Sequence, residues 1–386
     1  MRRSKCACFA LILGVLESSC TFYTACPAGG SNSGNNGNQS GGAGSGGVAP
    51  PPLLDGEWVN VTSTLAHKPS ECGNLSFGAN KPDEDMIIMG VAQHGLWATT
   101  DGGDSWNPLG DSSDPDPIVN RVSWLSFDPS DTNTFWESGV YNSFGIYKTT
   151  NDGKNFLKAG VIQHNDYFSV DYTDKARKTL LASGHEQVHK LYLSTDAATT
   201  WTEIGDYIPT DAGVCPFPFV LDSQTFLLGC GSYSGGKPGI FRSTDAGMNW
   251  QRVSTAGGGS PPLVASDGTM YWASEDTNGM TMSTDQGLTW SDPFAAGVVS
   301  TPSGTAAPLE LPDGRIAELS KDSVIVSADQ GQTWKPASAE LPFSPKGFFY
   351  SPQRKAFYVY YITCGVGTDA VPANGIMRFD FDYETQ

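Results

Sequence analysis

Two histidines and a glutamate near the middle of the chain have the spacing of a zinc-protease motif. The segment Ser183–Asp196 reads SGHEQVHKLYLSTD, in which His185, Glu186 and His189 form H-E-x-x-H. That motif works because a helix places two histidines at positions i and i+4 on one face. The segment ends in S-T-D, which belongs to a different pattern, so the surrounding elements must decide.

The residues around the motif do not predict a helix. An apolar strand TLLAS ends at Ser183 and LYLS begins the next strand at Leu191, so residues 184–190 form a loop that starts with glycine. No third-ligand motif follows this loop. We therefore interpret H-E-x-x-H as a chance match, and expect no catalytic zinc at His185 and His189 and no cofactor.

An eight-residue repeat explains the S-T-D. It reads TTDGGDSW at 99–106, TTNDGKNF at 149–156, STDAATTW at 194–201, STDAGMNW at 243–250, STDQGLTW at 283–290 and SADQGQTW at 327–334. The third residues are spaced by 40–50 positions and are Asp101, Asn151, Asp196, Asp245, Asp285 and Asp329. The side chain of this Asp or Asn can accept a hydrogen bond from the backbone N–H two residues further along the chain. Glycine at the fifth position can adopt a positive φ, and tryptophan at the last position buries a large ring. Since short strands flank each repeat, each is predicted to be a hairpin turn.

This repeat resembles the Asp-box, or BNR, repeat of sialidases, xyloglucanases and sortilin-type receptors, over about Leu53 to the C-terminus. The resemblance implies one four-stranded blade of a β-propeller per repeat. Gly375–Asp380 is similar to a strand that precedes a box, and Gly56–Val61 to one that follows a box. Together they would complete a last blade and remove the open edges of the ring. The expected fold is all-β, a seven-bladed β-propeller closed by the N-terminal strand.

Turn residues agree with seven blades. Gly, Pro, Asn, Asp and Ser are concentrated between the expected inner strands near positions 80, 128, 172, 221, 266, 311 and 351.

The resemblance also implies that the boxes lie on the bottom rim and that ligands bind the opposite, top face. All five histidines map by register to top-face loops of blades 1 to 3. The candidate ligand-binding residues are His67, His94, Arg121, Tyr141, His164, Asp166, His185 and Glu186. Further acidic residues expected on that face are Asp211, Glu275, Asp276 and Asp322. The alternative, that surface loops simply carry polar residues, stays open.

Sialidase activity is disfavoured by the arginines. A sialidase needs three top-face arginines to clamp the substrate carboxylate, and only Arg121 maps there. The other six lie beside bottom turns or boxes: Arg177, Arg242, Arg252, Arg315, Arg354 and Arg378. A xyloglucanase cleft lies between two propellers, which one propeller cannot form. Another glycoside hydrolase with paired carboxylates remains open.

The bulk composition limits the partners. Charged residues make up only 17% of the 386 residues, with 45 Gly and 25 Pro, which favours short strands and turns. The net charge of −18 repels nucleic-acid phosphates and anionic membranes, so we expect no nucleic-acid partner.

The N-terminal 52 residues are predicted to lie outside the fold. Residues 1–26 have a basic start and an apolar run too short to span a bilayer, and are expected to be a signal peptide with a candidate lipobox. Cys20 and Cys26 are the lipidation candidates, although Glu17 and Tyr23 replace the usual leucine, so an ordinary cleaved signal is the alternative. Residues 27–52, rich in Gly, Ser, Asn and Pro, should be a disordered tether with a reach on the order of 30 Å. The propeller is assigned to residues 53–386.

Four cysteines fall in the expected folded domain of an oxidising compartment. A two-residue turn at Asp222–Ser223 would set Cys215 opposite Cys230, which predicts a disulfide within blade 4. Cys72 and Cys364 have the equivalent places in blades 1 and 7, so a second disulfide would join the blades that close the ring. Buried free thiols are the alternative.

The expected function is binding rather than catalysis. We expect an extracytoplasmic monomer, anchored to the membrane only by lipid, that binds a glycan or cell-envelope protein through its top face. A glycoside hydrolase of the same fold and an envelope assembly or scaffold factor are the alternatives.

Overall fold

The computed structural model describes most of the chain from residue 54 onward. Its described residues are 54–65, 75–111, 113, 116–141, 144–231, 235–274, 279–299, 306–341, 343, 345–362 and 374–385. Pro50–Gln386 forms one compact unit. The predicted signal peptide and tether lie outside the described ranges, and so do seven residues named above: Cys20, Cys26, His67, Cys72, Glu275, Asp276 and Cys364. The expectations about them stay predictions.

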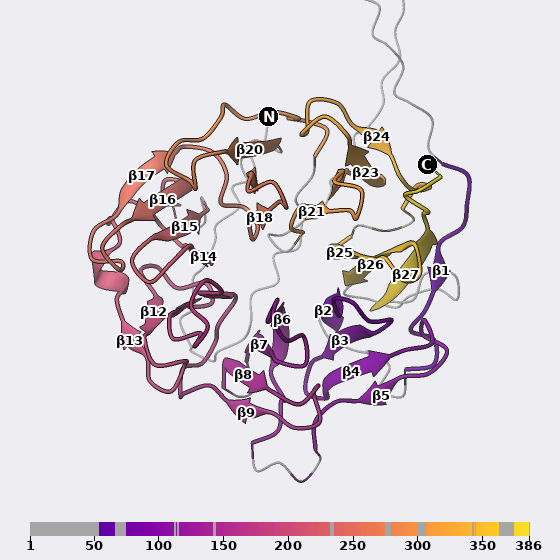
Figure 1. Cartoon of the computed structure of the whole chain (residues 1–386), viewed down its shortest axis with the longest axis horizontal. Helices are drawn as coiled ribbons and strands as arrows, with labels where there is room; N and C mark the ends of the chain where they lie inside the picture. The colour runs from indigo at the N-terminus through magenta and orange to yellow at the C-terminus, as the bar shows by residue number, and fades with distance from the viewer. Residues whose placement is uncertain are drawn as a thin grey trace, which may run out of the picture. The chain divides into compact units, whose positions relative to one another are not determined.

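Seven antiparallel sheets follow one another around a ring, and six of them are built only from strands that are consecutive in the sequence (Figure 1). In each of the first six, the first strand lies nearest the centre and the last strand nearest the periphery. The protein is therefore an all-β, seven-bladed β-propeller, as predicted. Within the described ranges the only helical element is a short 3-10 helix, η1 (Gly205–Tyr207).

The first four blades have four strands each. Blade 1 contains β2 (Leu75–Asn80), β3 (Ile87–Val91), β4 (Gly95–Thr99) and β5 (Asn107–Pro108). Blade 2 contains β6 (Arg121–Phe127), β7 (Phe135–Val140), β8 (Ile146–Thr149) and β9 (Leu157–Lys158). Blade 3 contains β10 (Phe168–Val170), β11 (Leu180–Ser183), β12 (Leu191–Ser194) and β13 (Thr202–Glu203). Blade 4 contains β14 (Phe217–Val220), β15 (Phe226–Cys230), β16 (Gly239–Ser243) and β17 (Gln251–Ser254).

The remaining blades complete the ring. Blade 5 contains β18 (Leu263–Val264), β19 (Met270–Ser274) and β20 (Gly279–Ser283). Blade 6 contains β21 (Leu309–Glu310), β22 (Ile316–Leu319), β23 (Val324–Ser327) and β24 (Lys335–Pro336). Blade 7 contains β25 (Gly347–Ser351), β26 (Ala356–Ile362), β27 (Asn374–Asp380) and, from the other end of the chain, β1 (Val59–Asn60). All seven predicted inner turns fall between the first and second strands of their blades.

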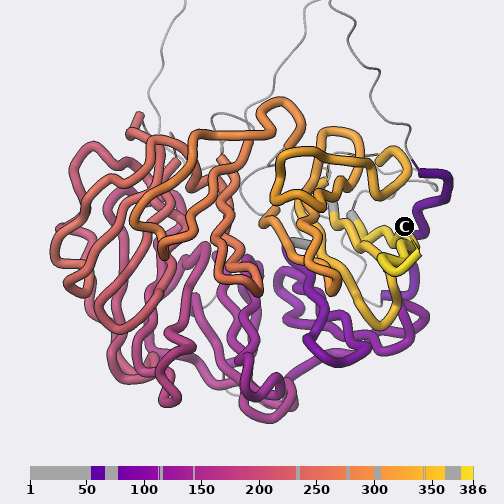
Figure 2. The backbone as a smooth tube through the Cα atoms, turned by 45° about the horizontal axis from the view of Figure 1, so that its top comes forward, coloured from indigo at the N-terminus to yellow at the C-terminus, as the bar shows by residue number. Residues whose placement is uncertain are grey.

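The ring closes where it was expected to close. β1 pairs antiparallel with β27, with Val59 opposite Arg378 (Figure 2, where the indigo and yellow ends meet). The indole N–H of Trp58 donates to the Ala339 carbonyl at 3.2 Å, and its ring lies 5.2 Å from that of Phe379. The N-terminal segment therefore completes the last blade by both backbone pairing and side-chain packing.

Blade 5 departs from the expectation that a strand follows every repeat. Instead of a fourth strand it has an isolated bridge, in which Met280 and Phe294 exchange backbone hydrogen bonds of 2.8 and 2.9 Å. Ser291 still donates its N–H to the Met282 carbonyl at 2.8 Å. The segment after the blade 5 turn therefore bonds to β20 on both sides of Pro293 without forming a regular strand.

The six repeated turns share one hydrogen-bond arrangement. The hydroxyl of the first residue donates to the side-chain oxygen of the third at 2.7–2.9 Å. The N–H of the fifth residue donates back to that hydroxyl at 2.7–3.0 Å. The acidic or amide side chain accepts the backbone N–H four residues on, not two as expected. The turn is wider because its fourth and fifth residues both have positive φ.

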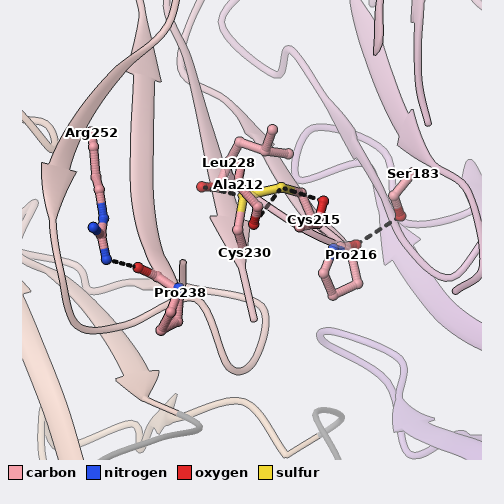
Figure 3. Close-up of a disulfide and its surroundings, with 9 residues drawn as sticks. Ser183, Ala212, Cys215, Pro216, Leu228, Cys230, Pro238 and Arg252 are labelled. Atoms are coloured by element: carbon pink, nitrogen blue, oxygen red, sulfur yellow. Dashed lines mark hydrogen bonds between the residues drawn. A yellow bond between two sulfur atoms is a disulfide. The ribbon is translucent and has the colours of Figure 1, made fainter. Parts of the chain in front are cut away.

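The disulfide predicted in blade 4 is present between Cys215 and Cys230 (Figure 3). The register behind that prediction was wrong by one residue, because Val220 lies opposite Phe226 and the turn contains three residues, 222–224. The Asp222 carboxylate explains the longer turn, since it accepts the N–H groups of both Gln224 and Thr225 at 2.8 Å. Cys215, two residues before β14, is nevertheless bonded to Cys230 at the end of β15.

Candidate functional site

Five of the candidate residues lie in loops on one face of the ring. We call this the top face; the bottom face carries the inner hairpin turns and the six repeated turns. Tyr141 directly follows β7, and His164 and Asp166 lie between β9 and β10. His185 and Glu186 follow β11. The topology thus brings loops of blades 2 and 3 together.

A chain of hydrogen bonds joins three of these side chains. Asp166 Oδ1 lies 2.7 Å from Nδ1 of His185, and Nε2 of His185 lies 2.8 Å from the Tyr141 hydroxyl. His164 completes the group, because its Nδ1 accepts the Tyr141 backbone N–H at 3.4 Å. The Tyr141 ring meets both imidazoles edge to face, at 5.6 Å from His164 and 5.2 Å from His185. We call Tyr141, His164, Asp166, His185 and Glu186 the top-face cluster.

Backbone strain is concentrated in the same loops. Tyr141, His164, Glu186 and His189 have φ values of 61°, 56°, 53° and 54°. Positive φ costs a non-glycine residue free energy, and such residues gather at functional sites where the surrounding structure imposes them. Most of the other non-glycine residues with positive φ lie in the repeated or inner hairpin turns, where the turn itself requires that conformation.

The electrostatics of the cluster favour a protonated imidazole and a neutral phenol. Burial lowers the pKa of His185, but the hydrogen bond and the charge of Asp166 outweigh burial, and the pKa is raised overall. Burial raises the pKa of Tyr141, the negative charge of Glu186 acts in the same direction, and Arg121 opposes them. Arg121 begins β6 opposite Val140, which places it beside Tyr141.

Sequence reasoning missed one cation. Lys346 directly precedes β25, the innermost strand of blade 7, as Arg121 begins the innermost strand of blade 2. Burial, and to a smaller extent the charge of Arg121, lower the pKa of Lys346 to about 8, although Asp166 acts to raise it. Lys346 therefore faces the same charges as the top-face cluster. Its place before an inner strand is visible in the sequence, so the same register that places Arg121 on the top face would have indicated Lys346.

Other residues singled out in the sequence lie outside the top-face cluster. His94 is in the loop between β3 and β4 of blade 1, where its carbonyl accepts the Trp97 indole N–H at 3.0 Å. The Asp211 carboxylate pairs with Lys237 at 2.7 Å. Nε2 of His189 is buried and has no hydrogen-bond partner in the described part of the chain.

The H-E-x-x-H segment is a loop between β11 and β12, as the sequence indicated. A loop does not give the two histidines the i, i+4 spacing on one face that zinc binding in this motif requires. Among the described residues no group of three or more His, Cys, Asp or Glu side chains is arranged to hold a metal ion.

The surface around Tyr141 is partly apolar. The Tyr141 side chain is 41% exposed, and Val188, in the loop that carries His185, is 45% exposed. The exposed carboxylate of Glu186 approaches Nε2 of His185 to 3.9 Å. An accessible aromatic ring surrounded by hydrogen-bonding groups suits a ligand that has both apolar and polar faces.

Comparison with solved structures identifies relatives of the fold. YCF48 bound to a D1 peptide is 16% identical, with a TM-score of 0.52 over 86% of this chain and 100% of that chain. Streptogramin B lyase is 12% identical, with a TM-score of 0.57 over 84% and 97% of the two chains. These two structures share the β-propeller fold with this chain. The glycoside hydrolase family 74 xyloglucanase from Xanthomonas campestris is 14% identical, with a TM-score of 0.52 over 85% of this chain and 54% of the enzyme.

These similarities, all well below 25% identity, establish the propeller fold and nothing finer. The chain spans about half the length of the xyloglucanase. No protein-family model matches the sequence. No curated protein matches it either. Within the described ranges, no helix has the length and apolar character needed to cross a bilayer.

Proposed function

We propose that this protein is an extracytoplasmic Asp-box propeller that binds a glycan or a peptide segment of a protein through the top-face cluster. The observation that carries the proposal is the hydrogen-bonded chain Asp166–His185–Tyr141, held by loops whose residues adopt costly backbone conformations. Strained backbone conformations and side chains fixed by hydrogen bonds are typical of a site that is preorganised for its ligand.

The chemistry of the cluster suits this ligand class. Tyr141 offers a ring face for stacking on a sugar or an apolar side chain, and its position is fixed before the ligand arrives. Glu186 and the partly exposed His185 and Asp166 offer hydrogen bonds to hydroxyl or amide groups around it. The solved relatives are consistent with both ligand types, since one was bound to a peptide and another is a xyloglucanase.

The location is inferred from the N-terminal segment. Residues 1–26 are proposed as a signal peptide with lipid attached at Cys20 or Cys26, residues 27–52 as a tether, and residues 53–386 as the propeller. The disulfide between Cys215 and Cys230 supports an oxidising compartment. In this arrangement the protein would reach partners in the cell envelope as a tethered monomer.

A glycan and peptide array, followed by calorimetry on the best ligand, tests the proposal. Tyr141→Ala should weaken binding at least tenfold, because an aromatic anchor at the centre of a site commonly carries about 2 kcal/mol or more. Tyr207→Ala is the matched control, because Tyr207 is similarly exposed, at 46%, but lies in η1. Equal losses in the two variants, or no loss in Tyr141→Ala, would place the ligand elsewhere.

A glycoside hydrolase is the second candidate, and one observation favours it. Asp166 and Glu186 approach opposite nitrogens of the same imidazole, at 2.7 and 3.9 Å, so two carboxylates face one site. Paired carboxylates are the machinery of most glycosidases. A panel of chromogenic glycosides decides: turnover that is abolished in Glu186→Gln supports hydrolysis, and no turnover by the native protein rejects it. An assembly factor would instead show binding to an envelope protein and none to glycans.

A further inference from the structure

The central channel contains a cavity of about 620 Å³ that the top-face cluster does not use. It is lined by inner strands of blades 1, 2, 6 and 7, namely β2, β6, β21 and β25, which surround the centre of the ring in Figure 1. Residues of the inner hairpin turns also line it: Pro82, Ser266, Pro312, Gly314 and Pro352. Because those turns lie on the bottom face, the cavity belongs to the side of the ring opposite the cluster. Its volume is in the range of small-molecule sites.

Aromatic rings form much of its wall. Phe77, on β2, lies 5.2 Å from Trp124 on β6 and 5.9 Å from Tyr360 on β26, measured between ring centroids. Phe348 and Phe349, on β25, line the same cavity. The faces of such rings carry partial negative charge and attract cations.

Among the described residues that line the cavity, Glu310 has the only charged side chain. Its Oε2 accepts the Ser266 N–H and its Oε1 accepts the Ser266 hydroxyl, each at 2.8 Å. A carboxylate has about four acceptor positions, so these two bonds leave acceptor capacity on both oxygens. The wall is therefore aromatic and negatively charged.

Several polar donors of the wall are already used within the protein. The Asn80 amide donates to the Lys81 carbonyl at 2.8 Å, and the Tyr350 hydroxyl donates to the Phe381 carbonyl at 2.9 Å. The nearby cations are paired as well: Arg315 with Asp313 at 2.7 Å, and Arg354 with Asp85 at 2.6 Å. A ligand that satisfies the Glu310 carboxylate must bring its own donors and positive charge.

We propose that this cavity is a second binding site, for a small organic cation in which a protonated amine is carried on an aromatic or aliphatic body. The amine donates to Glu310 and lies against the aromatic wall, while the body occupies the cavity and packs against Phe77, Trp124 and Phe348. The site is independent of the top-face cluster, and the net charge of −18 further favours a cation over an anion.

Calorimetry with three probes of similar shape tests the charge requirement. 1-Naphthylmethylamine should bind with one-to-one stoichiometry, 1-naphthylmethanol about tenfold more weakly, and 1-naphthoate not measurably. Glu310→Gln should reduce amine binding to the level of the alcohol and leave the alcohol unchanged. Glu340→Gln is the matched control, because Glu340 is exposed and does not line the cavity.

Two cavity-filling variants test the location. Ala307→Trp and Ala79→Trp add a large ring from opposite walls, and each should abolish amine binding in a protein whose melting temperature shows that it is folded. Because the two alanines lie on different blades, one variant remains informative if the other does not fold. Equal affinities for the three probes, no binding of the amine, or binding that persists in a folded filling variant would overturn the proposal.

Discussion

His185 lies between a carboxylate and a phenol, and this environment controls its charge. Burial acts to lower its pKa, but Asp166 acts more strongly to raise it. Asp166→Asn removes the main raising cause and leaves burial, so we expect the pKa of His185 to fall. An NMR titration of the imidazole nitrogens measures the change. Asp211→Asn is the control, since that carboxylate pairs with Lys237, and an unchanged His185 in Asp166→Asn would contradict the assignment.

The same shift links His185 to stability. Because the folded-state pKa is raised, the imidazolium stabilises the fold at pH values below the unfolded pKa. This contribution is lost as the pH rises through the folded pKa.

Two glutamates are completely buried in second strands, Glu137 in β7 and Glu318 in β22. Oε1 of Glu137 accepts one hydrogen bond from the Asn120 amide at 3.0 Å, and Oε1 of Glu318 accepts the Leu319 N–H at 2.8 Å. Burial raises the pKa of each carboxyl to about 8, so both are protonated in the folded protein at neutral pH.

These carboxyls predict a loss of stability with rising pH. The unfolded chain releases their protons near pH 4.5 and the folded chain near pH 8. Between those values the folded state binds more protons, so each group lowers the free energy of unfolding by up to about 1.4 kcal/mol per pH unit. Glu137→Gln should remove the contribution of one carboxyl to this pH dependence of the free energy of unfolding. The variant should therefore be stabilised most, relative to the native protein, above pH 8. Urea unfolding at pH 5.5 and 8.5 measures it; equal slopes in the variant and the native protein would refute it.

At the scale of elements, the same repeated turn occurs in six of the seven blades. Its acid is fixed by hydrogen bonds from neighbouring hydroxyl and backbone groups, which lower the pKa of Asp245 and Asp285 and bring that of Asp329 to about 2. The fourth and fifth positions need positive φ, and the repeat in blade 3 has alanines there, Ala197 and Ala198, at 60° and 67°. The other five repeats have glycine at the fifth position, so only blade 3 accepts strain from a side chain there.

Ala197→Gly should stabilise the protein, against the usual effect of glycine. A left-handed conformation costs an L-residue roughly 1 kcal/mol, and Ala197 is only partly buried, so relief of strain outweighs the lost methyl contacts. Ala176→Gly is the matched control: this exposed alanine has no positive φ, and glycine should cost about 0.5–1 kcal/mol there. Thermal and chemical unfolding measure both. Destabilisation by Ala197→Gly would contradict the account of the turn.

At the scale of the whole molecule, stability depends on closing the ring. The N-terminal segment contributes β1, the Trp58 contacts with blade 7, and the Val61 carbonyl that accepts the Trp106 indole N–H at 2.9 Å. Removing it would expose the outer edge of β27.

Two deletions test this dependence. Removal of residues 1–52 should leave the free energy of unfolding unchanged, whereas removal of residues 1–61 should lower it by about 3 kcal/mol or more and promote association through the open edge. Chemical denaturation and size-exclusion chromatography give the two readouts. Equal stability of the two deletions would show that the ring does not need its N-terminal strand.

The proposed Cys72–Cys364 disulfide acts at the same scale. A bond between blades 1 and 7 would enclose nearly the whole domain, and loop entropy allows up to roughly 5 kcal/mol of stabilisation. Peptide mapping without reduction should recover the two cysteines in one cross-linked peptide. Their recovery as alkylatable thiols from unfolded, unreduced protein would refute the bond.

The sequence alone was sufficient for the architecture. A hydroxyl, an acid, a glycine and a tryptophan recur at fixed positions because each turn must satisfy its own backbone groups locally. The turns can therefore be predicted from the sequence without knowing which other segments pack against them. The incomplete repeats at 56–61 and 375–380 likewise predicted the closure, since an unpaired strand edge needs a partner. The local rules failed at two places: Asp222 lengthened the blade 4 turn by one residue, and the segment after the blade 5 turn forms a bridge to β20 instead of a fourth strand.

Only the tertiary structure decided which side chains meet. Tyr141, Asp166 and His185 come from three loops of two blades, and register placed all three on the top face without predicting their hydrogen bonds. Lys346 joins their electrostatic environment from blade 7, far away in the sequence. The burial that raises the pKa of Glu137, and the aromatic cavity beside Glu310, likewise arise from contacts between blades. Such contacts depend on how separate sheets pack around one axis, which no local pattern records.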